Sequence, residues 1–449
     1  MELEDSPLYF DVQKILNSKA KDVHFIWTGV IHTPDDNIDI MKITTIDINK
    51  NFETNIGDEI MLECTMQLGT YIKRIYPFKG NLEITLTASP SNEISAEQTQ
   101  SSSRVTRYKA LLAVQGMLSG QGTEYDNYTE LDLNTLKLLT VNFQLIDRTV
   151  EKLRQVTVGG IFREATTEDV ARAILSEESK NIKVEGKPAV DKIDIVDTAI
   201  NIIRTQVVIP QGTKLLYVPT YLQKNCGGIY STGLGSYLQD KTWFMYPLFN
   251  TKRGNAEDRP QLMIYKVPAQ RLVHLDRSFN VESNVINILA TGELQLKDDG
   301  EATLINKGNG YRMADANKFM QGGLNESVDN KTVMKRGSNN DEVLIKPRDD
   351  QKNFAPIAAS GISINRAEAL SAITSRPSGI LTMQWQNSDH TLLIPGMIAT
   401  LNYDDRGEVK QVKCVLLNSQ TMIQKTGAGI TSTKYSQNTI LSFYAGIGI

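Results

Sequence analysis

The sequence predicts a mainly β protein with a mixed α/β segment between two β-rich ends. Apolar and polar residues alternate with period two in the first 148 residues, and the same pattern returns in residues 397–444, as in half-buried strands. Between these regions, a helical pattern at 166–181 is interleaved with short apolar runs. Short strands separated by turns favour a β-barrel or a sandwich over a parallel sheet.

The first β-rich unit is predicted to span residues 1–148. Its clearest strand is 60–68, where Ile60, Leu62 and Cys64 begin an alternation with neighbours that are mostly polar. Further strands are predicted at 25–31, 39–44, 82–88, 107–114 and 136–143. The turn-forming residues between the first two of these strands predict a hairpin. A loop is predicted at 91–104, where Ser, Gln and Glu predominate.

The mixed α/β segment is predicted to span residues 149–265. Thr166 followed by Asp169 resembles a capping box, so we expect a helix to begin there. The apolar stripe of this helix ends near Asn181.

Later in the same segment, residues 206–209 are predicted as a buried strand and 210–212 as the turn that ends it. Pro219 is expected to open a short helix, because proline suits the first helical turn. Gly227 is expected to end that helix.

The last part of the chain is predicted to be β-rich again. Residues 266–320 lead to a second β-rich unit at 354–449. Between them, 321–353 has glycines, asparagines and scattered charges with little to bury, which predicts a flexible loop. Within the last unit we expect strands at 397–403, 409–417 and 439–444, with a turn at 404–407.

Composition excludes several classes of protein. Lys plus Arg is 48 and Asp plus Glu is 52, so the net charge of −4 argues against a dedicated nucleic-acid binder. Cys64, Cys226 and Cys414 lie far apart, which favours neither a disulfide scaffold nor a metal cluster. The four histidines, also dispersed, are His24, His32, His274 and His390. The acidic amino terminus and the lack of a long apolar run predict no signal peptide, no membrane insertion and synthesis in the cytoplasm.

The familiar phosphate-loop, nucleophile-elbow and dinucleotide motifs are absent from the sequence. Two pairs of adjacent carboxylates, Asp35-Asp36 and Asp404-Asp405, could ligate calcium or act in acid–base chemistry. Both pairs fall in predicted turns, where aspartate favours local backbone bonding, so we interpret them as turn residues.

The glycine-rich run 227–235 could cradle a phosphate, but it lacks the lysine of such loops, which favours a structural loop. Cys226 beside it is interpreted as a buried thiol rather than a nucleophile, because no histidine is near it in the sequence. Sequons begin at Asn127, Asn325 and Asn330, but without a secretory signal they predict no glycosylation.

Tyrosines are concentrated in two places. Two of them follow the strand at 60–68 and five crowd one stretch of the α/β segment: Tyr71, Tyr76, Tyr217, Tyr221, Tyr230, Tyr237 and Tyr246. Tyrosine suits interfaces because it joins a large apolar area to a polar tip. The alternative is that these rings fill the rims of the protein's own barrels, and the sequence favours neither.

The motif Ile209–Thr213, with Tyr221–Gln223 and Gly228–Tyr230, resembles the central region of baseplate hub proteins of contractile-tailed bacteriophages. Those hubs are related to the upper part of VgrG and late-control-protein-D spikes. Further similar stretches follow in the expected order at 72–86, 233–235, 243–248, 308–316, 385–388 and 392–397. The chain is therefore similar to this hub family over most of its length.

The resemblance implies two tube-type β-barrels per chain, at 1–148 and 354–449, separated by a mixed α/β domain. It implies a homotrimer whose six barrels imitate the hexameric tail tube above and meet a trimeric spike below. The implied partners are tail tube protein, central spike, tape measure protein and baseplate wedge, with transient passage of DNA. Such a hub, located in the virion baseplate, needs no catalytic residue, cofactor or metal, and the 321–353 loop is expected to lie against a partner.

Two other functions stay open at this point. One is a receptor-binding tail protein, and the other is a tail-associated enzyme that degrades the cell wall. The second requires two carboxylates that face each other across a cleft.

Overall fold

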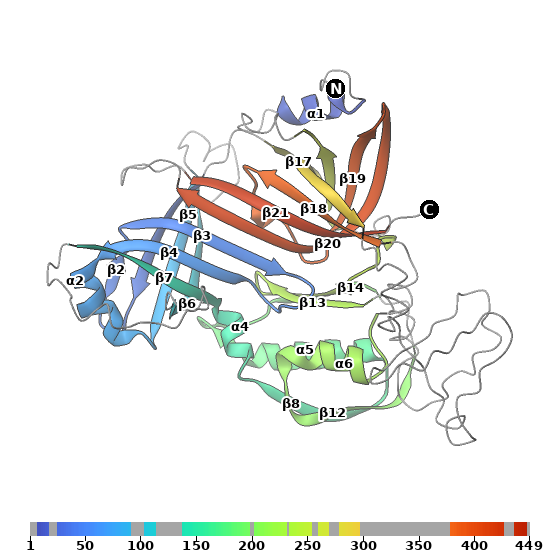
Figure 1. Ribbon diagram of the computed structural model, residues 1–449. Helices are drawn as coiled ribbons and strands as arrows, with labels where there is room; N and C mark the ends of the chain where they lie inside the picture. The colour runs from blue at the N-terminus through green and yellow to red at the C-terminus, as the bar shows by residue number, and fades with distance from the viewer. Residues whose placement is uncertain are drawn as a thin grey trace, which may run out of the picture.

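The computed structural model describes residues 7–17, 25–90, 103–113, 137–197, 202–230, 233–253, 259–268, 278–296, 378–425 and 435–446. The fold is mainly β, as the alternation predicts. Figure 1 shows a sheet from the N-terminal third beside a barrel from the C-terminal third, with the α/β segment beneath them. Within these ranges no helix is both long and apolar enough to span a membrane.

Several predictions concern residues outside the described ranges. These are the loops 91–102 and 321–353, the stretch 354–377, the motif 308–316, the three sequons, His24 and His274.

Seven strands form the N-terminal sheet. They are β1 (Phe25–His32), β2 (Asn37–Asp39), β3 (Lys42–Asn51), β4 (Glu59–Gln67), β5 (Leu82–Pro90), β6 (Arg104–Ala113) and β7 (Leu138–Asp147). Their order in space is β3-β4-β7-β6-β5-β1-β2, and the ladders are antiparallel. Three short helical turns connect β4 to β5: α2 (Leu68–Thr70), η2 (Tyr71–Ile75) and η3 (Tyr76–Phe78). The alternation at 60–66 is confirmed, since Ile60, Leu62, Cys64 and Met66 are all buried.

The predicted hairpin between 25–31 and 39–44 is correct only in part. β1 pairs with the short β2, but the chain then bends at Ile40–Met41 and β3 leaves β1 to pair with β4 and β20. Ile40 donates its backbone N–H to the Gly29 carbonyl at 2.9 Å, and its side chain occupies the space that a Cβ of Gly29 would need. The predicted turn therefore produces a hairpin with only three residue pairs, between β1 and β2. The bend at Ile40–Met41 then directs β3 away from β1.

A side chain from the far end of the chain bridges the open seam of this sheet. Among the described ladders, none joins β1 directly to β3. The Tyr435 hydroxyl lies 3.2 Å from the carbonyl oxygen of Ile43 on β3 and 3.4 Å from that of Trp27 on β1. Tyr435 and Ile423 also belong to the apolar core inside the sheet. The curled sheet is thus completed by residues of the C-terminal strands.

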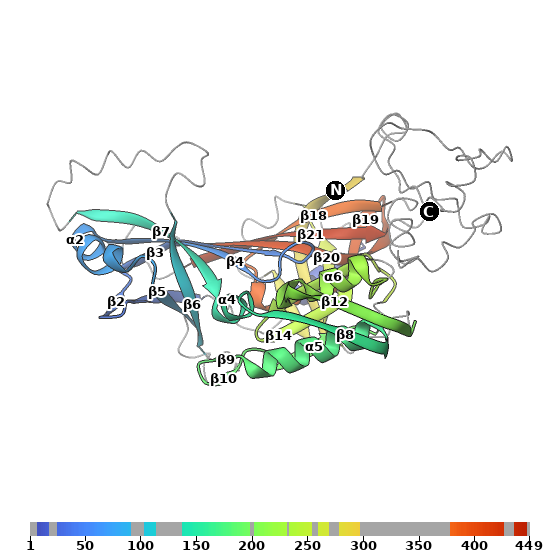
Figure 2. The ribbon, with the colours of Figure 1, turned by 90° about the horizontal axis from the view of Figure 1, so that it is seen from below.

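The α/β segment is built around its own apolar core, which includes Leu153, Leu175 and Trp243. Its elements are α4 (Arg148–Leu153), β8 (Thr157–Ala165), α5 (Thr167–Asn181), β9 (Lys183–Val184), β10 (Lys187–Pro188), β11 (Lys192–Ile195), β12 (Arg204–Lys214), η6 (Leu215–Tyr217), α6 (Val218–Asn225), β13 (Leu234–Gln239) and β14 (Thr242–Pro247). Figure 2 shows α5 running alongside the β8–β12 ribbon. The ribbon, the β9–β10 pair and the β11-β14-β13 sheet are separate from the large sheet.

Both helices predicted here are confirmed. The Thr166 side chain accepts the Asp169 N–H, and the Asp169 side chain accepts the Thr166 N–H, so the capping box is complete. α6 has Pro219 in its first turn and ends before Gly227, whose φ is +94°.

The prediction for residues 206–212 is wrong in two respects. The strand does not turn at Pro210 but continues to Lys214, with an irregular register between Ile209 and Thr213. It is also not buried on both faces, because Val208 is 46% exposed while Val207 and Ile209 are buried. The ribbon has only one partner layer, so its residues alternate between core and surface.

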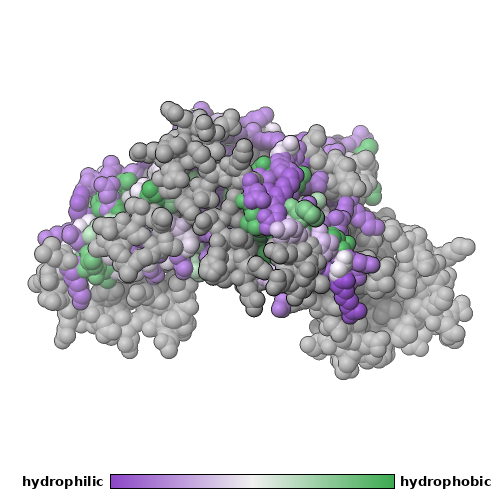
Figure 3. Space-filling view, turned by 90° about the horizontal axis from the view of Figure 1, so that it is seen from above, coloured by the Kyte–Doolittle hydropathy of each residue, from purple (hydrophilic) through white to green (hydrophobic). Residues whose placement is uncertain are grey.

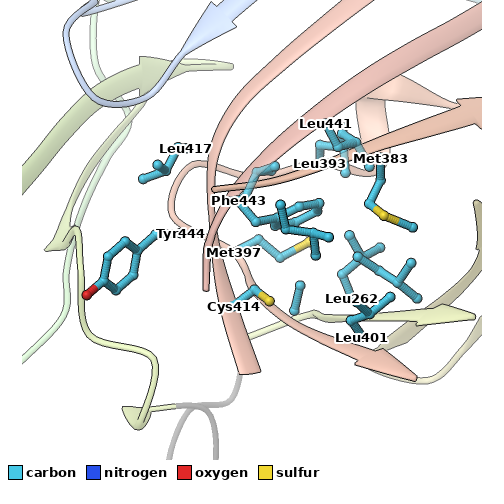
Figure 4. Close-up of a cluster of buried hydrophobic side chains, with 14 of the residues drawn as sticks. Leu262, Met383, Leu393, Met397, Leu401, Cys414, Leu417, Leu441, Phe443 and Tyr444 are labelled. Carbon is cyan, nitrogen blue, oxygen red and sulfur yellow. The ribbon is translucent and has the colours of Figure 1, made fainter. Parts of the chain in front are cut away.

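The C-terminal strands form a closed barrel of six strands. They are β15 (Gln261–Lys266), β17 (Val285–Leu296), β18 (Ser378–Gln386), β21 (Tyr435–Gly446), β20 (Glu408–Lys425) and β19 (Ile398–Asp405), and β19 pairs with β15 to close the ring. β15 is parallel to both of its neighbours, and the other ladders of the ring are antiparallel. Figure 4 shows Phe443, Met383 and Leu401 within the apolar core of this barrel.

The barrel begins earlier in the chain than the predicted boundary at 354. β15 lies in the region assigned to the α/β segment, and β17 lies in the segment expected to lead to the barrel. The predicted strands at 397–403, 409–417 and 439–444 are confirmed, and the second of them extends to Lys425. This length lets β20 pair with β19 at one end and with β3 at the other.

Two smaller elements complete the barrel region. β16 (Phe279–Glu282) pairs with β17, and η9 (His390–Leu392) lies between β18 and β19. The amino-terminal helix α1 (Tyr9–Leu16) packs Val12 and Ile15 against Val267 and Leu289. On the face that Figure 3 shows, hydrophilic residues predominate among those coloured, with hydrophobic residues scattered between them.

Candidate functional site: a continuous sheet face and the cavity behind it

One ladder joins the closed barrel to the N-terminal sheet. β20 and β3 pair antiparallel from Asn418↔Asn51 to Gln424↔Thr45. As a result, β18, β21, β20, β3, β4 and β7 lie side by side in one sheet that crosses both halves of the protein (Figure 1, Figure 2).

The register aligns side chains of these six strands in rows on the face opposite the cores. One row contains Gln386, Asn438, Met422, Asp47, Met61 and Gln144. The next row contains Gln384, Ile440, Gln420, Asn49 and Glu59. A third contains Ser436, Gln424, Thr45, Glu63 and Asn142. We call this surface the row face.

The row face is polar, mostly uncharged and slightly acidic. Amides and hydroxyls predominate in its three rows, its charged members are Asp47, Glu59 and Glu63, and the rows contain no Lys or Arg. Gln420 Nε2 donates to an Asp47 carboxylate oxygen at 3.4 Å, and Asn49 Nδ2 donates to Glu59 at 3.2 Å. Two of the three carboxylates are thus hydrogen-bonded across strands.

On the opposite side of the same junction, polar groups are buried between two apolar cores. Lys50 pairs in register with Ser419, and both are buried. The hydroxyls of Thr421 and Thr439 lie 2.9 Å apart, and that of Ser388 lies 2.6 Å from Thr439. The two cores are therefore separated by a polar seam where β20 passes from one to the other, and Ser388, Thr421 and Thr439 are hydrogen-bonded within it.

A cavity of about 440 Å³ opens beside this seam, where the N-terminal sheet, the β13–β14 turn and η9 meet. Its apolar wall comes from the inside of the N-terminal sheet and includes Trp27, Ile46 and Ile48. Its ionisable residues are Lys50, Asp58, Arg104, Tyr108, Asp147, Asp240, Lys241, Asp389 and His390.

Most of these ionisable groups are held by neighbours within the fold. Asp58 accepts a hydrogen bond from the Tyr237 hydroxyl at 2.8 Å, and its other oxygen lies 3.7 Å from Lys50 Nζ. Asp147 caps α4 by accepting the N–H groups of Thr149 at 2.7 Å and Val150 at 3.1 Å. Arg104 on β6 donates to Thr391 and lies 3.5 Å from Asp389, which ties the N-terminal sheet to the barrel.

Burial shifts the pKa of three cavity residues, His390, Asp147 and Tyr108, in the direction that favours the neutral form. Burial, followed by the nearby Lys50 charge, lowers the pKa of His390 to about 3. Gln437 Nε2 lies 2.7 Å from Nδ1 of that neutral ring. Burial raises the pKa of Asp147 despite the hydrogen bonds that it accepts, and burial raises the pKa of Tyr108.

Within the described parts of the chain, no three His, Cys, Asp or Glu side chains are placed to hold a metal ion. The two predicted carboxylate pairs lie in separate turns. Asp36 accepts the N–H of Asn37 at 2.8 Å and pairs with Arg74, while Asp35 is exposed. Asp404 accepts the N–H of Gly407 at 2.8 Å, and Asp405 pairs with Lys410. These contacts agree with the interpretation of both pairs as turn residues.

Gln223 and Thr167 hold the described part of the glycine-rich loop after α6, and Thr167 donates its hydroxyl to the Gly228 carbonyl at 2.6 Å. Gln223 Oε1 accepts the N–H groups of Ile229 at 2.7 Å and Tyr230 at 3.1 Å, so these donors are already used within the loop. Cys226 is half-buried, and burial raises its pKa. Burial raises the pKa of Cys64 and of Cys414 to about 12, which keeps both thiols protonated.

The tyrosines divide between core and surface. Tyr230, Tyr237 and Tyr246 are buried, and the Tyr246 hydroxyl donates to the Phe52 carbonyl at 3.1 Å. Tyr217 is 45% exposed. Tyr221 is half-buried, and the rings of Tyr71 and Tyr76 lie 5.9 Å apart at the surface. Tyr237 and Tyr246 thus belong to the core that includes the barrel, and Tyr230 belongs to the core of the α/β segment. Tyr71 and Tyr221 pack in part against apolar cores, while Tyr76 and Tyr217 are exposed.

Neither the cavity nor the row face is predicted by local patterns in the sequence. A signal for Lys50 was present, because it continues the buried positions Ile46 and Ile48 in an alternating strand. The residues that pair between β3 and β20 lie more than 350 positions apart in the sequence, and no local pattern specifies such a pairing.

Comparison with known proteins gives only structural neighbours. No family model and no curated protein matches the chain. A tail protein from Neisseria meningitidis MC58 is similar with a TM-score of 0.44 and 9% identity, over 93% of this chain and 96% of that one. The 43 kDa tail protein of prophage MuSo2 from Shewanella oneidensis has a TM-score of 0.44 and 11% identity, over 93% and 97%. A type VI secretion component from E. coli has a TM-score of 0.39 and 10% identity, over 89% and 73%. These neighbours are phage tail and type VI secretion proteins.

Proposed function

We propose that this protein is the structural hub of a phage tail baseplate, a trimeric adaptor between the hexameric tail tube and the trimeric central spike. The observation that carries the proposal is the β3–β20 ladder, which makes one sheet cross both halves of the chain. A protein that lines a wide channel needs such a surface, because each copy must cover a third of the circumference without a break.

In this proposal the two halves act as two tube-type barrels. The C-terminal barrel is closed, and the N-terminal sheet curls around its own core, with Tyr435 at its seam. Three copies arranged in a ring then present six similar units to the hexameric tube, and the threefold axis fits the spike. Baseplate wedge components bind around this ring.

The row face is proposed to line the channel through which tape measure protein and DNA pass. Its three rows contain three carboxylates and no Lys or Arg. Tight DNA binding depends on cations that neutralise phosphates. A polar, slightly acidic wall therefore lets DNA pass without retaining it.

The hub is proposed to act in the virion, after synthesis in the host cytoplasm, and without catalytic residues, cofactors or metal. Several ionisable groups of the cavity have structural roles: Asp147 caps a helix, and Asp58 pairs with Lys50 and accepts the Tyr237 hydroxyl.

Sedimentation velocity and electron microscopy of the full chain test the proposal. The expected result is a homotrimer with a central passage, which binds purified tail tube protein at one end. A compact monomer, even with tube and spike proteins added, would contradict it. Loss of turbidity when the protein is added to exposed cell walls would instead indicate a degrading enzyme. Binding to the host surface but not to tube protein would indicate a receptor-binding protein.

A further inference from the structure

A second hollow lies on the surface of the α/β segment and is lined by none of the cavity residues. Its volume is about 580 Å³, and it is lined by Ile56, Arg154, Thr213, Lys214, Leu216, Tyr217 and Tyr221. These residues come from the β3–β4 connection, the end of α4, the end of β12, η6 and α6. We call it the tyrosine groove.

The tyrosine groove is basic and aromatic. Arg154 and Lys214 are both exposed, and neither forms an ion pair with another residue in the described ranges. No carboxylate lines the groove, although the chain as a whole is acidic with a net charge of −4. Tyr217 and Tyr221 add apolar rings with polar tips, the residue type that is enriched at interfaces. The groove therefore suits an acidic segment with aromatic or aliphatic side chains.

The chain itself contains a segment with this chemistry. Residues 114–136 include Glu124, Asp126, Glu130 and Asp132 and no Lys or Arg. Tyr125, Tyr128, Leu131 and Leu133 lie between and beside these carboxylates. We propose that the tyrosine groove of one copy binds the acidic 114–136 segment of a neighbouring copy. This inference rests on the proposed function, because it assumes that copies of the chain meet in a ring.

The anchor points of the segment favour a neighbour over its own groove. The segment joins Ala113, at the end of β6, to β7, whose described strand begins at Leu138. Arg154 lies beyond the opposite end of β7, after α4. The ten residues of β7 span roughly 33 Å, whereas Ala113 pairs with Asn142, five positions before the end of that strand. A return to its own groove therefore needs nearly full extension of the limb that leads to β7. Such extension costs conformational entropy. We therefore assign the segment to the groove of a neighbouring copy.

A labelled peptide tests the contact directly. A fluorescein-labelled peptide of residues 114–136 is titrated with the full chain and followed by anisotropy at low and at physiological salt. We expect saturable binding that Arg154→Glu with Lys214→Glu weakens about tenfold or more, because two attractive charges become repulsive. Lys180→Glu with Lys187→Glu is the matched control, since both lysines are exposed on the same segment but outside the groove. Equal loss in both variants would mean a non-specific charge effect and would overturn the proposal.

Association of charge-reversed chains tests the trans arrangement. One chain carries Arg154→Glu and Lys214→Glu, and the other carries Asp126→Lys and Glu130→Lys. In the first chain both the groove and the segment are acidic, and in the second chain both are basic. We therefore expect trimer association of either chain alone to weaken about tenfold. Mixed in equal amounts, unlike chains form attractive contacts. A ring of three that contains both chains has two such contacts and one repulsive contact between like chains, so association recovers in part. If the segment bound its own groove, mixing would restore nothing, and that result contradicts the proposal.

The two proposals fail differently. A wild-type chain that forms no ring contradicts the proposed hub function. A normal ring whose stability is unchanged by both reversals contradicts only the groove assignment. Tighter binding of a single-stranded oligonucleotide than of the peptide would show that the groove is a phosphate site and would also overturn the assignment.

Discussion

The ammonium group of Lys50 lies 3.7 Å from Oδ2 of Asp58, and both side chains line the cavity behind the row face. The two partners depend on this contact unequally. The Lys50 side chain is 4% exposed, whereas that of Asp58 is 24% exposed. Asp58 also accepts the Tyr237 hydroxyl. The carboxylate thus has other stabilising contacts, while the ammonium has lost most of its water.

This inequality predicts that the two residues respond differently to substitution. Asp58→Asn leaves a buried ammonium without its counter-ion and should lower the free energy of unfolding by about 3 kcal/mol. Lys50→Met leaves a carboxylate with a hydroxyl donor and partial solvent, and should cost about 1 kcal/mol. Urea denaturation of both variants and of the double variant measures this. A larger loss for Lys50→Met than for Asp58→Asn contradicts the assignment.

The bridge made by Tyr435 can be tested without disturbing packing. Tyr435→Phe removes the hydroxyl that lies 3.2 Å from the Ile43 carbonyl and keeps the ring. We expect a loss of about 1 kcal/mol in stability and faster amide exchange in β1 and in the first residues of β3. Tyr403→Phe, on the barrel strand β19, is the matched control and should leave exchange in β1 unchanged. Unchanged exchange in Tyr435→Phe would exclude a role at the seam.

The pairing of β17 with β18 leaves no space for a side chain at Gly292. A Cβ on Gly292 of β17 would lie 2.6 Å from Sδ and 2.8 Å from Cα of Met383 on the neighbouring strand. Gly292→Ala should therefore destabilise the protein by at least about 2 kcal/mol. Gly80→Ala, where a Cβ would meet nothing within 4 Å, should change stability by less than about 1 kcal/mol. Thermal unfolding of the two variants compares them, and equal melting temperatures would contradict the close packing at Gly292.

His390 predicts how stability depends on acid. Its pKa is about 3 in the folded protein against 6.5 in the unfolded chain. Between these values the unfolded chain binds a proton that the folded protein does not, so the free energy of unfolding falls as the pH falls. The contribution of His390 to this slope approaches about 1.4 kcal/mol per pH unit.

The difference between wild type and His390→Gln isolates this contribution, because glutamine keeps an acceptor for Gln437 and does not titrate. Relative to the variant, the wild type should lose stability from pH 6.5 towards pH 3. Denaturant titrations at half-unit steps measure this difference, and measurements at pH 7.5 give the baseline cost of the substitution. Parallel pH profiles for the two proteins would show that His390 is accessible to protons in the folded state.

Local signals predicted the local structure well. The alternation at 60–66, the capping box of Thr166 and Asp169, and Pro219 in the first turn of α6 all appear in the structure as expected. These features depend on interactions within a few residues. The failures at 39–44 and at Pro210 occurred where a strand changes partner or has only one covered face, which local patterns do not specify.

The sequence by itself determined that the protein is mainly β and where most strands and the main helices lie. It also showed a resemblance to phage hub proteins. Tertiary structure decided that β15 and β17 join the C-terminal barrel, that β20 pairs with β3, and that Lys50 and His390 line one cavity. The physical reason is that strand pairing and burial of charge depend on contacts between residues far apart in the chain. The alternation of apolar and polar residues determines which face of a strand is apolar. Which strand pairs with it, and which side chains lose contact with solvent, is decided only when the chain folds.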